Sequence, residues 1–109
     1  MLVCGGRDFC DWELLCKTLD AIEVSCLIHG AAPGADATAR LWAQERGIPI
    51  MEFPANWDFF GNAAGPIRNN AMLHYGSPDL VVAFNGGKGT AHITKQAELK
   101  GIPVHYVGT

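Results

Sequence analysis

Short apolar runs alternate with segments of helical length along the whole 109-residue chain. The runs lack strict alternation of apolar and polar residues, which is typical of strands that are buried on both faces of a sheet. They are "LVC" (Leu2 to Cys4), "SCLIH" (25–29), "IPIMEF" (48–53), "DLVVAF" (79–84) and "IPVHYV" (102–107). This alternation predicts strand–helix units rather than an all-α or all-β protein.

Two of the intervening segments place apolar residues on one face of a helix. Their stripes are Trp12, Leu15, Leu19 and Ile22, and Ala35, Ala39, Trp42 and Ala43. Residues that favour helix ends agree with this reading. We expect Asp11 to cap the first helix, Pro66 to lie in the first turn of the third, and helices to end near Gly47, Gly76 and Gly101.

Five strands joined by four helices predict a small doubly wound, Rossmann-like α/β fold, with a parallel sheet covered by helices on both faces. We expect the strand order 3-2-1-4-5 and a single domain spanning residues 1–109. In that order the switch point lies between the first and fourth strands, and ligands bind beyond the carboxyl ends of the strands there. The loops at this point are "GGRDF" and "NGGKGT".

Composition narrows the classes of partner. The net charge is −3 with no cluster of Lys or Arg, which argues against a general binder of DNA or RNA. No apolar stretch approaches the roughly 20 residues of a membrane span, and the first residues do not resemble a signal peptide, so we expect a soluble cytoplasmic protein. Four cysteines without a C-x-x-C pair predict no metal site, and we expect Cys4 and Cys26 to be buried in strands as free thiols.

Glycine is concentrated in three of the predicted loops. Such loops let backbone N–H groups approach an anion, and the following helix adds its partial positive charge, although glycine also makes ordinary tight turns. The sequence lacks a Walker A ending and a G-x-G-x-x-G fingerprint. Thr90 can either cap the following helix or bond a phosphate oxygen. The seven loop glycines are Gly5, Gly6, Gly30, Gly34, Gly86, Gly87 and Gly89.

Two arginines lie on the same predicted edge. Arg7 follows the first strand and Arg68 lies at a helix start, where a guanidinium can bind phosphate through two hydrogen bonds. The alternative is that each is a surface arginine or is paired with Asp8 or Asp36.

Four motifs, in order along nearly the whole chain, carry a family resemblance: "VCGGRDFCD", "LIHGAAPGADATARLWA", "FPANWDFFGNAAGPIRNNAML" and "PDLVVAFNGGKGTAH". They resemble the small stand-alone YspA/YpsA-related branch of the SLOG superfamily, which also contains the Lonely Guy phosphoribohydrolases and the DprA/Smf proteins. The resemblance implies a Rossmann-like fold and a nucleotide or nucleotide derivative held at the glycine-rich edge. We expect Arg68, Asn69, Lys88 and Thr90 to be among the contacts of this ligand, and we expect no cofactor.

The chain departs from the hydrolase pattern P-G-G-x-G-T-x-E-E. Asn85 replaces the proline, and His92 and Ile93 stand where that pattern has its two glutamates. In the arginine motif Arg68 is retained, and Asn69 replaces the lysine. Cleavage of a glycosidic bond uses a carboxylate beside an oxocarbenium-like centre, and that carboxylate is missing from its family position.

Another acid could take its place. Asp36 is the best candidate and Asp8 the second, although Asp36 could instead cap a helix or pair with an arginine. His92 could act as acid or base, or could simply be exposed. We therefore expect a nucleotide-binding module or sensor. The alternative is hydrolysis of nucleoside 5'-monophosphates by Arg68 and Asp36, and a DprA-like role in DNA handling ranks third.

The aromatic segment "NWDFFGNAAG" (56–65) is long for a connection between a strand and a helix. Its side chains could stack on a base, cover the site, fill the end of the core or form a dimer interface. We expect a homodimer.

Overall fold

A computed structural model describes residues 1–108 and places five strands in one all-parallel sheet of order β3-β2-β1-β4-β5. The doubly wound α/β fold and the strand order predicted from the sequence are confirmed. Strand β1 has the predicted bounds, whereas each of the other four strands begins two residues later than its predicted run. The five strands are β1 (Leu2–Cys4), β2 (Leu27–His29), β3 (Ile50–Glu52), β4 (Val81–Phe84) and β5 (Val104–Val107).

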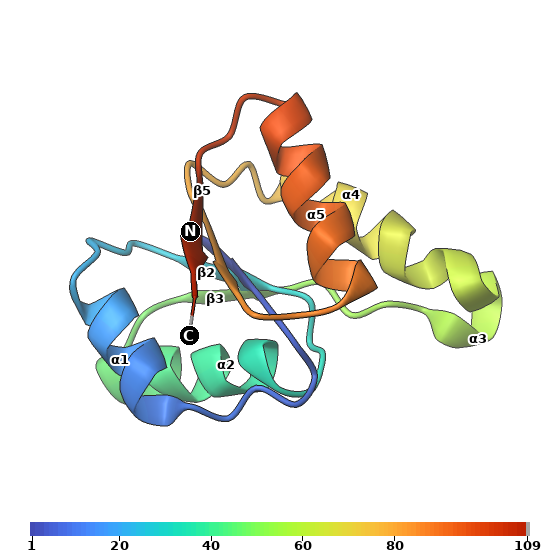
Figure 1. The fold of residues 1–109 in the computed structure, drawn as a ribbon. Helices are drawn as coiled ribbons and strands as arrows, with labels where there is room; N and C mark the ends of the chain where they lie inside the picture. Colours follow the sequence, from blue (N-terminus) through green and yellow to red (C-terminus); the bar gives the residue numbers. More distant parts are fainter. Residues whose placement is uncertain (109) are drawn as a thin grey trace.

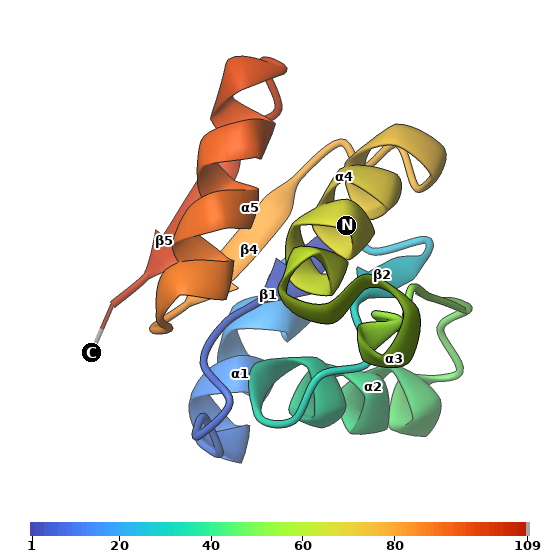
Figure 2. The same cartoon turned by 90° about the vertical axis from the view of Figure 1, so that its right-hand side faces the viewer.

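Helices cover both faces of this sheet. Helices α1 and α2 lie on one face, and α4 and α5 lie side by side on the other (Figure 1; Figure 2). The helices are α1 (Trp12–Asp20), α2 (Ala35–Arg46), α3 (Trp57–Phe60), α4 (Ala64–Tyr75) and α5 (Lys88–Leu99). The arrangement brings the loops after β1 and β4 together at the switch point.

The predicted helix ends are confirmed in their main features. The Asp11 side chain accepts a hydrogen bond from the Leu14 N–H at 3.1 Å and so caps α1. Gly47 ends α2 in the left-handed conformation that glycine favours, with φ of 66°. Pro66 is the third residue of α4, where its missing N–H costs no helical hydrogen bond.

The core consists of two apolar clusters, one on each face of the sheet. Val3, Leu15 and Trp42 belong to the cluster under α1 and α2, whereas Leu2 and Met72 belong to the cluster under α4 and α5. Neighbouring residues of β1 therefore point to opposite faces, and both faces are apolar, as a central parallel strand requires.

The prediction that the strands are buried on both faces is confirmed for β1, β2 and β4. It is wrong for β3 and β5, which are partly exposed because they form the edges of the sheet. Cys4 is buried in β1 as predicted. The prediction for Cys26 is wrong, since it is only partly buried and precedes β2.

The predicted long connection after β3 contains helical structure. Residues Trp57–Phe60 form α3 and Gly61–Ala63 form a turn of 3-10 helix (η1) that leads directly into α4. The Asn56 side chain accepts a hydrogen bond from the Phe59 N–H at 3.1 Å and caps α3. The segment therefore has its own local structure, and it projects beyond the end of α4 (Figure 1).

Among the described helices, none combines the length and the apolar character needed to cross a bilayer.

Candidate functional site

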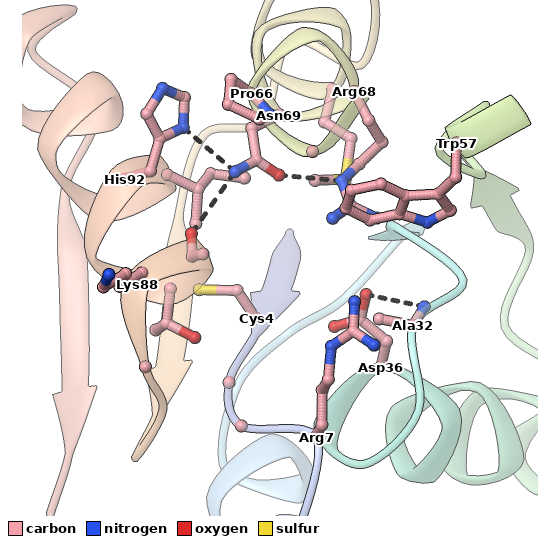
Figure 3. A pocket seen from close by; sticks show the side chains of 18 of the residues that line it. Cys4, Arg7, Ala32, Asp36, Trp57, Pro66, Arg68, Asn69, Lys88 and His92 are labelled. Carbon is pink, nitrogen blue, oxygen red and sulfur yellow. Dashed lines mark hydrogen bonds between the residues drawn. The ribbon is translucent and has the colours of Figure 1, made fainter. Parts of the chain in front are cut away.

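A cavity of about 670 Å³ opens at the carboxyl edge of the sheet, where the loops after β1 and β4 meet the first turns of α4 and α5 (Figure 3). Its volume lies within the range usual for small-molecule sites. Ten of the residues singled out from the sequence line it: Gly5, Gly6, Arg7, Asp36, Arg68, Asn69, Gly87, Lys88, Gly89 and Thr90.

Three of the singled-out glycines lie behind the wall of the cavity and allow its loops to approach one another. A Cβ on Gly34 would lie 2.1 Å from the Gly6 carbonyl oxygen, and Gly34 also has a φ of 80°. A Cβ on Gly30 would lie 2.4 Å from Nη1 of Arg68, and one on Gly86 would lie 2.8 Å from the Gly6 nitrogen. These three glycines do not line the cavity because they pack against neighbouring loops and the Arg68 side chain.

Helix α5 begins at the cavity without a side-chain cap. Its N-cap is Gly87, and Lys88, Gly89 and Thr90 form the first turn. The first N–H groups of an α-helix have no intrahelical partner and attract anions. Added Cβ atoms on Gly87 and Gly89 would meet nothing within 4 Å, so the backbone here is open to a ligand. The capping role considered for Thr90 is wrong, because the helix starts two residues before it.

Arg68, Asn69 and His92 form a hydrogen-bonded chain between α4 and α5 (Figure 3). Arg68 Nε donates to Asn69 Oδ1 at 2.9 Å, which fixes the orientation of the amide. Asn69 Nδ2 then lies 3.1 Å from His92 Nδ1 and 3.3 Å from the Gly89 carbonyl oxygen. Because an amide nitrogen only donates, His92 Nδ1 accepts and its ring proton is on Nε2.

Hydrogen bonds hold the Arg68 guanidinium in place but leave one of its nitrogens without a partner among the described residues. Its Nη1 donates to the Gly30 carbonyl oxygen at 2.6 Å, and Nη2 makes no hydrogen bond within residues 1–108. Burial lowers the pKa of Arg68 from its usual value, although Asp36 opposes this effect, and an arginine at the cavity wall remains charged. Nη2 is therefore available to an acceptor on a ligand.

Asp36 lies in the first turn of α2 and is only 7% exposed. Its Oδ2 accepts hydrogen bonds from the N–H groups of Gly30 at 2.9 Å and Ala32 at 3.3 Å. Burial raises the pKa of Asp36, and the two backbone N–H groups, His29 and Arg68 oppose the rise. The possibility that Asp36 caps α2 is wrong, since Gly34 is the N-cap and the carboxylate binds the loop after β2 instead.

Arg7 lies at the opposite side of the cavity from α5. Its guanidinium carbon is 5.9 Å from the centre of the Trp57 indole ring, a cation–π distance. Within the part of the chain that is described, Arg7 forms no salt bridge with Asp8 or Asp36. Asp8 is exposed and does not line the cavity, which removes it as a replacement for the missing carboxylate.

The charges around the cavity are unbalanced. Arg7, Arg68 and Lys88 contribute three cationic side chains, whereas Asp36 contributes the one carboxylate among the described lining residues. The whole chain has a net charge of −3, so the excess of positive charge is local. This arrangement favours an anionic ligand.

Reasoning from the sequence missed several lining residues. Met72 follows Arg68 by four positions and Ile93 follows Gly89 by four, so helical spacing could have placed both on the cavity face. Cys4 ends β1 at the cavity, and burial raises the pKa of its thiol to about 12, which excludes a reactive thiolate. The others are Ala32, Asn62, Gly65 and Pro66, with Trp57 and His92 considered earlier only as alternatives.

No group of three or more His, Cys, Asp or Glu side chains within residues 1–108 is arranged to hold a metal ion.

The sheet order and the loop-lined cavity at its switch point define a Rossmann-like α/β protein. Residues 1–60 match the YspA, cpYpsA-related SLOG family. The chain is also 33% identical over 116 residues to the Gene 61 protein of Mycobacterium phage D29, covering 95% of this chain and 92% of that protein. No solved protein structure matches the chain. The chain therefore belongs to the YspA, cpYpsA-related SLOG family, and this membership suggests a nucleotide-related binding or processing role.

Proposed function

We propose that the protein binds a nucleotide or nucleotide derivative in the cavity at the switch point and acts as a binding module or sensor. The observation that carries this proposal is the cavity of about 670 Å³, in which three cationic side chains and the uncapped start of α5 surround one carboxylate. In a chain of net charge −3, such a site selects anions locally rather than along a nucleic-acid backbone. Residues 1–109 are proposed to form one nucleotide-binding domain.

The ligand's phosphate is proposed to lie at the first turn of α5. Lys88 is exposed and forms no salt bridge within residues 1–108, so its ammonium is available. The N–H groups of Gly89 and Thr90 and the Thr90 hydroxyl supply further donors at the same place. Arg68, through Nη2, is proposed as an additional phosphate ligand, and Arg7, on the opposite side of the cavity beside Trp57, as a further contact of the ligand.

Hydrolysis is the second candidate because one buried carboxylate, Asp36, does line the cavity near Arg68. We rank hydrolysis second because His92 occupies the position at which the related hydrolases have an acidic residue. The Nδ1 of His92 is bonded to Asn69, so this ring nitrogen is not free to take a proton from a nucleophile.

A thermal-shift screen with AMP, the other nucleoside 5'-monophosphates, NAD and ADP-ribose tests the binding proposal. A ligand at about 100 times its Kd stabilises the folded state by roughly 2.7 kcal/mol. In a domain of this size the unfolding midpoint then rises by about 10 °C or more. Absence of any shift with the whole panel would contradict the proposal.

The same nucleotides separate binding from cleavage. We expect no free base after prolonged incubation with the protein, measured by chromatography. Release of base that disappears in Arg68→Ala would show that the protein is a hydrolase and would replace the binding-only account. Cytoplasmic location and homodimer formation stay predictions from the sequence.

A further inference from the structure

Within residues 1–108, one carboxylate oxygen of Asp36 has no hydrogen-bond partner. Oδ2 accepts the N–H groups of Gly30 and Ala32, whereas Oδ1 makes no hydrogen bond to any described residue. The residue is only 7% exposed, and the small exposed part borders the cavity (Figure 3). Oδ1 is not sealed inside the protein, since the buried polar side-chain atom without a partner among the described residues is His29 Nε2, so a donor on a ligand can reach Oδ1 from the cavity.

The surroundings of Oδ1 determine what kind of ligand group fits there. A phosphate oxygen would be repelled by the carboxylate, and phosphate has better partners at Lys88 and the first turn of α5. A group that donates hydrogen bonds, such as a hydroxyl, is the complementary partner of Oδ1. We therefore expect the phosphate of a ligand to lie at the first turn of α5, and the hydrogen-bond donors of the same ligand to lie at Asp36 on the opposite wall of the cavity.

An aromatic surface lies on the Asp36 side of the cavity. The Trp57 indole lines the cavity, and Arg7 lies 5.9 Å from the ring centre (Figure 3). Trp57 is 48% exposed, so its ring is still able to take a planar group against it. Stacking of a nucleobase on such a ring is favourable and tolerant of base identity.

We propose that Asp36 recognises the sugar: Oδ1 accepts hydrogen bonds from the ribose hydroxyls of a nucleotide whose phosphate lies at the start of α5 and whose base lies against Trp57. The site then takes ribonucleotides in preference to nucleotides that lack these hydroxyls. This inference rests on the proposed nucleotide-binding function and deepens it by naming the class of sugar.

The test compares each of the four ribonucleoside 5'-monophosphates, and ADP-ribose, with its 2',3'-dideoxy counterpart by calorimetric titration. We expect the unmodified protein to bind at least one ribonucleotide about 10-fold or more tightly than its dideoxy form, as is typical for the loss of hydrogen bonds to a charged group. Asp36→Asn keeps an oxygen for the Gly30 and Ala32 N–H groups and presents an amide in place of Oδ1. The preference should fall several-fold in this variant, because the hydroxyls lose their charged acceptor.

Asp8→Asn is the matched control, since it removes a carboxylate from the same edge of the sheet but outside the cavity. It should leave the preference unchanged. Equal binding of ribonucleotide and dideoxy forms by the unmodified protein, or a full preference retained in Asp36→Asn, would overturn this inference and leave the binding proposal standing. If none of the nucleotides binds, the proposed function itself falls and the sugar assignment falls with it.

Discussion

At the scale of single residues, the glycines of the site have two different roles. Gly34 has a φ of 80°, and a Cβ added there would lie 2.1 Å from the Gly6 carbonyl oxygen, so the glycine allows the loops after β1 and β2 to pack together. Gly89 lies in the first turn of α5, and an added Cβ there would meet nothing within 4 Å. One glycine is needed by the fold, and the other leaves room beside the proposed phosphate.

Alanine at these two positions is predicted to have opposite effects on stability. Gly34→Ala should lower the free energy of unfolding by about 2 kcal/mol or more, through backbone strain and a steric clash. Gly89→Ala should raise it by about 0.4–1 kcal/mol, because alanine loses less backbone entropy in a helix. Urea unfolding of the two variants measures both changes, and equal destabilisation would contradict the assignment of roles.

Asp36 is expected to reduce the stability of the free protein at neutral pH. Burial raises the pKa of its carboxyl, so the folded state binds a proton more readily than the unfolded state. Stability from this group is present below the usual pKa of 3.8 and is lost as the pH rises through the raised value. Asp36→Asn should therefore have a higher free energy of unfolding than the unmodified protein near neutral pH, measured by urea denaturation. A clearly less stable variant would show that the charge itself supports the fold.

At the scale of elements, the turn after β2 depends on a buried histidine. His29 is 1% exposed, and its Nδ1 accepts the Ala31 N–H at 2.9 Å, where Ala31 has a φ of 58°. Its Nε2 lies 3.3 Å from a Glu52 oxygen without the geometry of a hydrogen bond. Protonation of Nδ1 would remove the acceptor for Ala31, so this turn is sensitive to acid.

The predicted consequence is a loss of stability in mild acid. Burial lowers the pKa of His29 below its usual 6.5, although Asp36 and Glu52 oppose this and Arg40 adds to it. The unfolded state then binds more protons, so the stability is fully present above pH 6.5 and is lost as the pH falls through the lowered value. Urea unfolding at several pH values, repeated in Asp36→Asn to remove the neighbouring titration, checks this. His105→Gln, which changes an exposed histidine, should keep the same pH dependence. A free energy of unfolding that stays constant as the pH falls below 6.5 would contradict the role of His29.

The start of α5 can be tested by reversing one charge. Lys88→Glu should weaken nucleotide binding by roughly 10-fold or more, because it replaces a charged donor at the proposed phosphate position. Lys95→Glu makes the same change on an exposed residue of the same helix outside the cavity, and it should change the affinity by less than about twofold. Similar losses in both variants would indicate only a general electrostatic effect.

The sequence predicted the elements better than the contacts between them. Apolar runs and glycine positions located all five strands and the four long helices, because short apolar runs and the residues that favour helix ends are local signals. They did not reveal α3, whose four residues are too few for a periodic pattern. They also could not show that Asp36 binds the loop after β2 or that Asn69 bonds His92, because these contacts depend on how separate elements pack.

At the scale of the whole molecule, an acidic protein has a cationic cavity at one edge of its sheet and an exposed aromatic segment beside it. Phe59 is 78% exposed and Trp57 is 48% exposed, so this segment presents aromatic side chains to the solvent beside the cavity. The homodimer expected from the sequence stays a prediction, and light scattering after size-exclusion chromatography would measure the mass in solution.

The central claim is that a nucleotide binds with its phosphate at the first turn of α5. The most direct measurement is a titration of ¹⁵N-labelled protein with AMP and with ADP-ribose, followed through the backbone amide signals. The account predicts saturable shifts at Lys88, Gly89 and Thr90 and in the loop Gly5 to Arg7, with unchanged signals in β5, which forms one edge of the sheet and does not line the cavity. Saturable shifts that avoid the start of α5, or no shifts with either nucleotide, would contradict it.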